Sequence, residues 1–243
     1  MSRHVTQMTI DDAEHYSPEE RQKIIDSYLP HERDARARGV PVLGSGRVFP
    51  ISEDKLSIEP FAIPEHWPQI GGMDFGWDHP FAAVSLCWDR DWDRVYVTRT
   101  YKVREETPLI HAGALVHWGK TMPWAWPHDG LQHDKGSGDQ LCSQYEKHGL
   151  NMLPEKATHE AGGFGTEAGI SEMLDRMKTD RFKVFSNLED WWFEFRMYHR
   201  KDGLIVKERD DLMSATRIGL MMLRKAEVLK SKSWDKADTK WVV

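Results

Sequence analysis

The spacing of apolar and polar residues changes near residue 69 and divides the chain into two regions. Before this point, SPEERQKIIDSYL has Ser17 followed by Pro18 and acidic residues, a pattern typical of a helix start. HERDARARG predicts a continuing charged helix that ends at Gly39, and VPVLGSGRVFPIS is rich in glycine and proline, as connectors are. Because residues 1–66 contain few core-forming side chains, we expect them to form a linker or hinge arm.

From Gln69 onward the pattern predicts a compact domain over residues 67–243. QIGGMDFG and FAAVSLCWD are typical of strands, DRDWD of a polar turn, and RVYVTRTYKV alternates as a half-buried strand does. Since a tight turn joins the second and third strands, we expect all three to be antiparallel neighbours.

Helices and short strands then alternate. Strand patterns occur at MPWAWPHDG, LNMLPE and RFKVFSN, and helix patterns at TPLIHAGALVHWGK, SGDQLCSQYEKHG, ISEMLDRMKTD, LEDWWFEFRMYHR and DDLMSATRIGLMMLRKAEVL. In the first helix, Leu109, Ala112, Leu115 and Val116 are spaced to share one apolar face. The order predicts an α/β fold, with a mixed sheet of three antiparallel strands and then parallel strands, covered by helices on both faces. It is the order of the ribonuclease-H-like fold, although many α/β folds share most of it.

Composition narrows the class of protein. The 243 residues are 40% hydrophobic, enough for a core, and the formal net charge of −6 argues against a non-specific nucleic-acid coat. Cys87 and Cys142 form no CxxC pair, so neither a structural zinc site nor a disulfide framework is expected, and a reducing cytosol fits best. No apolar run approaches the ~20 residues of a membrane-spanning helix, and the N-terminus lacks the apolar core of a signal peptide.

Four aspartates are candidates for a metal site. Asp74 lies inside a predicted buried strand, where an ionised carboxylate is costly unless a cation meets it. Asp129 ends the fourth strand, and Asp210 and Asp211 begin the last helix. If the first and fourth strands are adjacent, these acids can converge, and oxygen-only ligands suit Mg²⁺ or Mn²⁺. Two such ions, roughly 3.5–4 Å apart, would stabilise the attacking and leaving oxygens of a phosphodiester displacement.

Structural roles would also explain several of these residues. Asp210 and Asp211 could simply favour a helix N-terminus, and Asp129 before a glycine could be a turn residue. Asp74 is the hardest to explain in this way. His79 and His128 flank the acids and are either structural or orient a metal ligand and relay protons.

Motifs of other enzyme classes are missing from the sequence. There is no GxxxxGK[ST] phosphate loop, no GxSxG elbow and no HExxH helix. GGFG at residues 162–165 lacks the strand and helix of a dinucleotide-binding fingerprint.

A family resemblance runs along nearly the whole chain. In order, the sequence contains ARARGVPVLGSGRVFP, HWPQIGGMDFGWDHPFAAVSL, AWPHDG followed by DKGSG, GLNML and DDLMSATR. Together they resemble the nuclease domain of the large terminase subunit of tailed phages. The resemblance implies a ribonuclease-H-like fold and a DNA endonuclease that cuts concatemeric phage DNA with two divalent metals. It assigns these metals to Asp74, Asp129 and Asp211, and leaves open whether Asp210 takes the place of Asp211.

The resemblance also implies partners and a location. They are double-stranded DNA, a terminase ATPase domain, the small terminase subunit and the portal protein, in the cytoplasm of a bacterial host. Family members carry an N-terminal ATPase that this chain lacks, so we expect an excised domain, a truncated prophage product or a split gene.

Basic residues near the acids are candidates for phosphate contacts, which position DNA without reading its sequence. They are Lys135, Arg200, Lys201 and Arg217. Residues 161–169 and a hairpin at 198–206 could form a mobile rim over the groove. With a net charge of −6, we expect DNA binding by the isolated domain to be weak and salt-sensitive.

Two other functions remain open from the sequence alone. A catalytically silent module that docks on the portal or small subunit would have no need of Asp74 in a strand. Another ribonuclease-H-like nuclease, such as a junction resolvase, would act as a dimer on branched DNA. A 3′–5′ exonuclease would be expected to carry a DxE pair, where this chain has Asp74-Phe75-Gly76.

Overall fold

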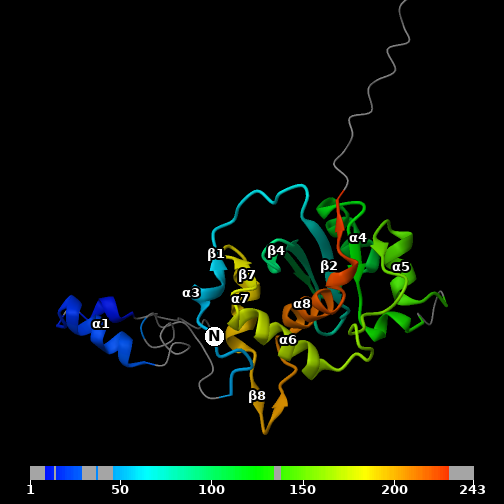
Figure 1. Cartoon of the computed structure of the whole chain (residues 1–243). Coiled ribbons are helices and arrows are strands. Elements are labelled where there is room, and N and C mark those ends of the chain that lie inside the picture. The colour runs from blue at the N-terminus through cyan, green and yellow to red at the C-terminus, as the bar shows by residue number, and fades with distance from the viewer. Residues whose placement is uncertain (1–8, 14, 29–36, 38–45, 134–137, 230–243) are drawn as a thin grey trace, which may run out of the picture.

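A mixed β-sheet forms the centre of the computed structural model, which describes residues 9–13, 15–28, 37, 46–133 and 138–229 (Figure 1). The eight-stranded sheet has the order β1-β7-β4-β3-β2-β5-β6, and β10 pairs with β2. The strands are β1 Ser57–Ile58, β2 Pro68–Asp74, β3 Phe81–Asp89, β4 Arg94–Val103, β5 Pro123–Ala125, β6 Asn151–Met152, β7 Phe182–Phe185 and β10 Glu227–Val228, with a separate hairpin of β8 Arg200–Lys201 and β9 Leu204–Ile205.

Helices cover both faces of this sheet. The α-helices are α1 Pro18–Ser27, α3 Glu53–Leu56, α4 Pro108–Leu115, α5 Leu141–Lys147, α6 Thr166–Lys178, α7 Glu189–Met197 and α8 Asp211–Met221, and 3-10 turns occupy Ile10–Asp12, Val116–Trp118, His128–Leu131 and Leu223–Lys225. One apolar core packs the sheet against α6, α7 and α8, and a second packs it against α4 and α5. Figure 1 shows α8 lying across the sheet near α6 and α7, with α4 and α5 grouped apart from them. Within the described residues, no helix combines the length and apolar character needed to cross a membrane.

The predicted strand arrangement is confirmed. β2, β3 and β4 are consecutive antiparallel neighbours, and β5 lies parallel to β2 on its other side. β6 and β7 add to the sheet in parallel, beside β5 and β4. The helix expected after Ser17 is also present, and the Ser17 side chain accepts a hydrogen bond from the backbone of Glu20. The hairpin expected at 198–206 corresponds to β8 and β9.

Several local predictions are wrong. The last helix, predicted to reach Leu229, ends at Met221, and Glu227–Val228 within it form strand β10, which pairs with β2. On the predicted apolar face of α4, Ala112 and Leu115 are buried, but Leu109 is 57% exposed and His111 is buried in addition. The helix predicted to run to Arg200 ends at Met197, since the backbone beyond it pairs with residues 46–48. The helix expected to end at Gly39 falls, apart from Ala37, outside the described residues.

Part of the region expected to be a linker contacts the sheet. Phe49 and Leu56 are fully buried in the core that contains α7 and α8. β1 pairs in parallel with β7 at the sheet edge. The division of the chain at residue 66 stays a prediction.

A close approach of backbones fixes α8 on β2. A Cβ atom added to Gly72 would lie 2.2 Å from the Ala215 carbonyl oxygen and 2.6 Å from the Gly219 nitrogen. No L-residue with a side chain fits there without displacing the helix. The first turn of α8 therefore lies beside the end of β2, where Asp74 is located.

Candidate active site

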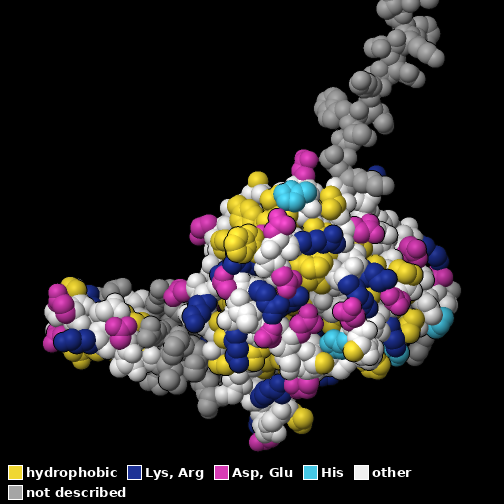
Figure 2. All heavy atoms as spheres, in the orientation of Figure 1, with side chains coloured by type: hydrophobic (Ala, Val, Ile, Leu, Met, Phe, Trp, Pro, Cys, Tyr) yellow, Lys and Arg dark blue, Asp and Glu magenta, His cyan; other side chains and the backbone are white. Residues whose placement is uncertain are grey.

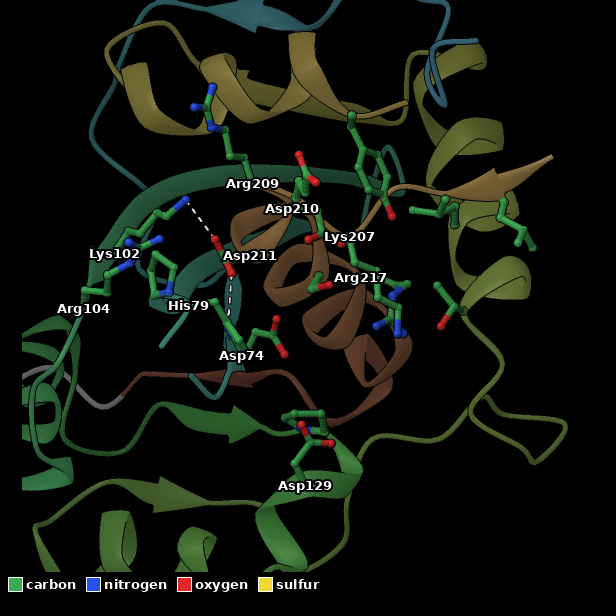
Figure 3. A pocket seen from close by; sticks show the side chains of 18 of the residues that line it. Asp74, His79, Lys102, Arg104, Asp129, Lys207, Arg209, Asp210, Asp211 and Arg217 are labelled. Carbon is green, nitrogen blue, oxygen red and sulfur yellow. Dashed lines mark ion pairs between the residues drawn. The ribbon is translucent and has the colours of Figure 1, made fainter. Parts of the chain in front are cut away.

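The four predicted aspartates line one cavity of about 840 Å³. Asp74 is at the end of β2, Asp129 is in the 3-10 turn after β5, and Asp210 and Asp211 are at the start of α8. Figure 3 shows Asp74 between Asp211 and Asp129. Because β2 pairs in parallel with β5, their carboxyl ends lie at the same edge of the sheet, which brings Asp74 and Asp129 to one opening.

The Asp74 carboxyl group is strongly perturbed by its surroundings. Burial, together with the charges of Asp211, Asp129 and Asp210, raises its pKa to about 8, against the opposing effect of Arg217. Arg217, on α8, is thus the cation that faces Asp74 in this structure. Burial in turn lowers the pKa of Arg217, and its Nε has no hydrogen-bond partner among the described residues.

Two side chains from other parts of the fold contact the Asp211 carboxylate. Its carboxylate lies 2.9 Å from Lys102 Nζ and 3.4 Å from His79 Nδ1, and the residue is only 6% exposed (Figure 3). Lys102, on β4, also contacts the buried carboxylate of Glu194 on α7. Although burial disfavours its charged form, these two carboxylates raise the pKa of Lys102.

The N-terminus of α8 is capped from a distance. Neither aspartate that begins the helix caps it, since Asp210 makes no side-chain cap hydrogen bond. Instead, Glu194 Oε2 accepts hydrogen bonds from the backbone nitrogens of Leu212 at 2.7 Å and Met213 at 3.3 Å. Burial raises the pKa of Glu194 to about 7, against the opposing effect of Lys102. Burial, and then the charge of Asp211, also raise the pKa of Asp210.

Asp129 is the most loosely held of the four acids. It is exposed, and within the described residues its carboxylate makes no hydrogen bond or ion pair. In this part of the chain, no three acidic, histidine or cysteine side chains stand close enough together to hold a metal ion as they are placed. The acids therefore share a cavity without forming a closed ligand cage.

The two histidines have different neighbours. His79 contacts Asp211, although its side chain is 62% exposed. His128 instead lies 2.6 Å from Lys156 Nζ through its Nδ1 and stacks on Phe164, with ring centroids 5.8 Å apart. Of the two, His79 is the one in contact with a cavity acid.

The basic residues expected to bind DNA also differ in where they lie relative to the cavity. Arg217 and the β8–β9 hairpin border the cavity, but Arg200 in that hairpin forms a two-pronged ion pair with Glu167. Lys201 is exposed on β8 and does not line the cavity. Lys135 lies outside the described residues.

Sequence reasoning missed several residues that the fold brings to this site. Lys102, Arg104, Lys207 and Arg209 all line the cavity. Figure 2 shows Lys and Arg side chains interspersed with Asp and Glu on the face that carries α8 and the hairpin. The sequence did contain one signal for Glu194, the buried partner of Lys102. Glu194 follows Trp191 by three residues, which places an acid on the apolar face of α7.

Comparison with protein families identifies the chain. The family model described as "Terminase RNaseH-like domain" matches residues 71–223. The chain belongs to this terminase family. A second model, "Terminase large subunit, T4likevirus-type, N-terminal", matches residues 2–55 of the terminase chain.

Curated relatives agree with this assignment. The large terminase subunit of Salmonella phage P22 is 49% identical over 230 residues, covering 94% of this chain and 46% of the relative. That of Enterobacteria phage LP7 is 50% identical over 222 residues, covering 91% and 47%. The terminase chain thus spans about half the length of these relatives.

Solved structures confirm the predicted fold. The nuclease domain of the P22 large terminase matches with a TM-score of 0.71 and 48% identity, over 76% of this chain and 96% of that domain. The large terminase of a thermophilic bacteriophage matches with a TM-score of 0.57 at 14% identity, over 86% of this chain and 53% of that one. The latter likeness shows the fold alone.

Proposed function

We propose that this terminase chain is a metal-dependent DNA endonuclease that cuts concatemeric phage DNA during genome packaging, by hydrolysis with two divalent ions. The observation that carries the proposal is the convergence of Asp74, Asp129, Asp210 and Asp211 on one cavity. Burial, and then the charges of the other three, raise the pKa of Asp74. A cation bound among these carboxylates would offset both the burial and the repulsion.

The donor set fits Mg²⁺ or Mn²⁺, because it consists of carboxylate oxygens at the edge of a water-accessible cavity. Asp74, Asp129 and Asp211 would hold the ions, with Asp210 beside them. Divalent ions, when bound, would activate a water for attack on phosphorus and stabilise the leaving 3′ oxygen. The nuclease domain of bacteriophage SPP1, solved with bound Mn, shares this fold with a TM-score of 0.52 at 16% identity.

The side chains of the terminase chain would prepare the site in distinct ways. Asp74 is fixed by the sheet, and Lys102 and His79 orient the Asp211 carboxylate. Arg104, Lys207 and Arg209 at the cavity wall would contact phosphates, which position DNA without selecting sequence. Lys135, Arg200 and Lys201 stay predicted phosphate contacts, and Arg217 faces Asp74 inside the cavity.

The partners and the location belong to the same proposal. We place the nuclease in the cytoplasm of a bacterial host, acting on double-stranded DNA beside the terminase ATPase domain, the small terminase subunit and the portal protein. Because the net charge is −6, binding of DNA to this chain alone would be weak and salt-sensitive, and delivery would depend on those partners.

The first test is cleavage of supercoiled plasmid in Mn²⁺, Mg²⁺ or EDTA. We expect nicking and linearisation in either metal and none in EDTA. Asp74→Asn and Asp211→Asn should each reduce the rate by at least about 100-fold. Asp78→Asn, which alters an exposed acid in the loop after β2, serves as the matched control and should cut normally. Equal cutting by Asp74→Asn and the intact chain would contradict the assigned site, and intact plasmid under every condition would contradict nuclease activity of this chain.

A further inference from the structure

Glu194 is the least exposed acid near the cavity, and it does not line the cavity. It is 1% exposed, on the inner face of α7. Its two carboxylate oxygens have separate partners. Oε2 accepts from the backbone nitrogens of Leu212 and Met213, in the first turn of α8, and Oε1 accepts from Lys102.

Lys102 connects this buried carboxylate to Asp211. Its Nζ contacts Glu194 Oε1 and lies 2.9 Å from Asp211 Oδ2, so one ammonium group is shared by two carboxylates. Glu194 therefore fixes Asp211 in two ways. It binds the backbone that follows Asp211, and it binds Lys102, the cation that contacts the Asp211 side chain.

A helix cap alone would not require this arrangement. An aspartate at the start of a helix is itself among the preferred caps, and α8 begins with two. Supplying the cap from α7 leaves the carboxylates of Asp210 and Asp211 directed to the cavity. Burying an ion pair in place of apolar residues also brings little stability.

We infer that Glu194 is a positioning residue for the metal site, which sets the place of Asp211 by capping α8 and by sharing Lys102. The inference rests on the proposed function. Groups that orient metal ligands in this way typically change metal affinity or activity by 10–100-fold when they are replaced. Without the Glu194 charge, Lys102 would pair with Asp211 alone and compete with a metal for it.

The test is the Mn²⁺ dependence of plasmid nicking, together with calorimetric Mn²⁺ titration and a thermal melt, for Glu194→Gln and Glu194→Asp. Glutamine keeps the size and an oxygen for the backbone but loses the charge. Aspartate keeps the charge but is too short to span both partners. We expect each variant to need about 10-fold or more Mn²⁺ for half-maximal cutting. In an Asp211→Asn background, Glu194→Gln should have no further effect on Mn²⁺ binding.

A matched control is a second ion pair that involves α7, between Arg196 on this helix and Glu53 on α3. Arg196 of α7 forms an ion pair with Glu53, with Nε–Oε1 and Nη2–Oε2 distances of 2.6 and 2.7 Å, away from the cavity. Glu53→Gln should leave the Mn²⁺ requirement unchanged. The inference is overturned if a folded Glu194 variant keeps the Mn²⁺ requirement within 2-fold of the parent, or if Glu53→Gln shifts it equally. Absence of Mn²⁺ binding and cutting by the parent chain would instead overturn the proposed function.

Discussion

The two sides of the acid cluster are built differently. Asp74 and Asp211 belong to β2 and α8, which meet with no room for a side chain at Gly72. β2 is paired with β3 on one side and with β5 and β10 on the other. Asp129, in contrast, follows the three-residue strand β5 in a short 3-10 turn and is exposed. We infer that the fold pre-organises one half of the site and leaves the other half to adapt to its ligand.

The largest effect should come from disturbing the rigid half. Gly72→Ala would place a methyl group against the backbone of α8, and overpacking of this kind costs about 2–3 kcal/mol of unfolding free energy. Urea denaturation measures it. Gly113→Ala, where nothing lies within 4 Å of the added Cβ, is the matched control and should gain about 0.5–1 kcal/mol. Equal stabilities of the two variants would show that β2 and α8 are not in close contact.

Metal should act mainly on the adaptable half. At a Mn²⁺ concentration about 100 times its Kd, binding stabilises the metal-binding conformation by about 2.7 kcal/mol relative to conformations that cannot bind the ion. The backbone around Asp129 would then open to solvent roughly 100-fold less often. We expect this protection in amide hydrogen exchange of residues 128–132 and a much smaller change within β2, which the sheet already protects. The same increase in both segments would contradict the division into a rigid and an adaptable half.

The stability of the metal-free chain should depend on pH through Asp74. Its pKa is about 8 in the folded chain and 3.8 ordinarily, so the folded state binds more protons between these values and stability falls as pH rises through this range. Asp74→Asn should therefore stabilise the chain in EDTA at pH 8 by on the order of 1–3 kcal/mol, a value reduced by the partial exposure of Asp74. Urea midpoints at pH 8 and pH 4.5 provide the measurement, and the gain should largely disappear at the lower pH. A gain that does not change with pH would assign the effect to packing.

The smallest effect is expected at the cavity rim. Arg200 and Glu167 form an ion pair whose acid is largely exposed, so Arg200→Gln should cost less than about 1 kcal/mol of unfolding free energy. Salt-dependent DNA binding would test whether this arginine also contacts phosphate. A large stability loss would show that the hairpin supports the core.

The sequence was sufficient for the parts of this molecule that depend on local pattern. Alternation and the acidic turn predicted β2, β3 and β4, and the order of elements predicted that Asp74 and Asp129 could converge if the first and fourth strands were adjacent, as they are. It was insufficient where the partner is distant along the chain. Lys102 and Glu194 are 92 positions apart, and no spacing rule connects a strand lysine to a helix acid in that way.

The local sequence pattern also failed to predict where some helices end. The residues after Met197 continue a helical pattern, but Arg200 donates its backbone N–H to the Gly46 carbonyl at 2.7 Å, and this tertiary pairing ends the helix. The exposed Leu109 has a similar explanation, since the position of α4 on the sheet decides which of its apolar residues are buried.

The contact between β2 and α8 limits how this sequence can vary. Gly72 and Gly219 face each other, and a Cβ on Gly219 would lie 2.8 Å from Leu86 and 3.4 Å from Gly72. Neither glycine carries a chemical group, and neither lines the cavity. Even so, in a library of random variants selected for DNA cutting, position 72 would be recovered as glycine almost as strictly as position 74 is recovered as aspartate, and position 219 would tolerate little more than alanine.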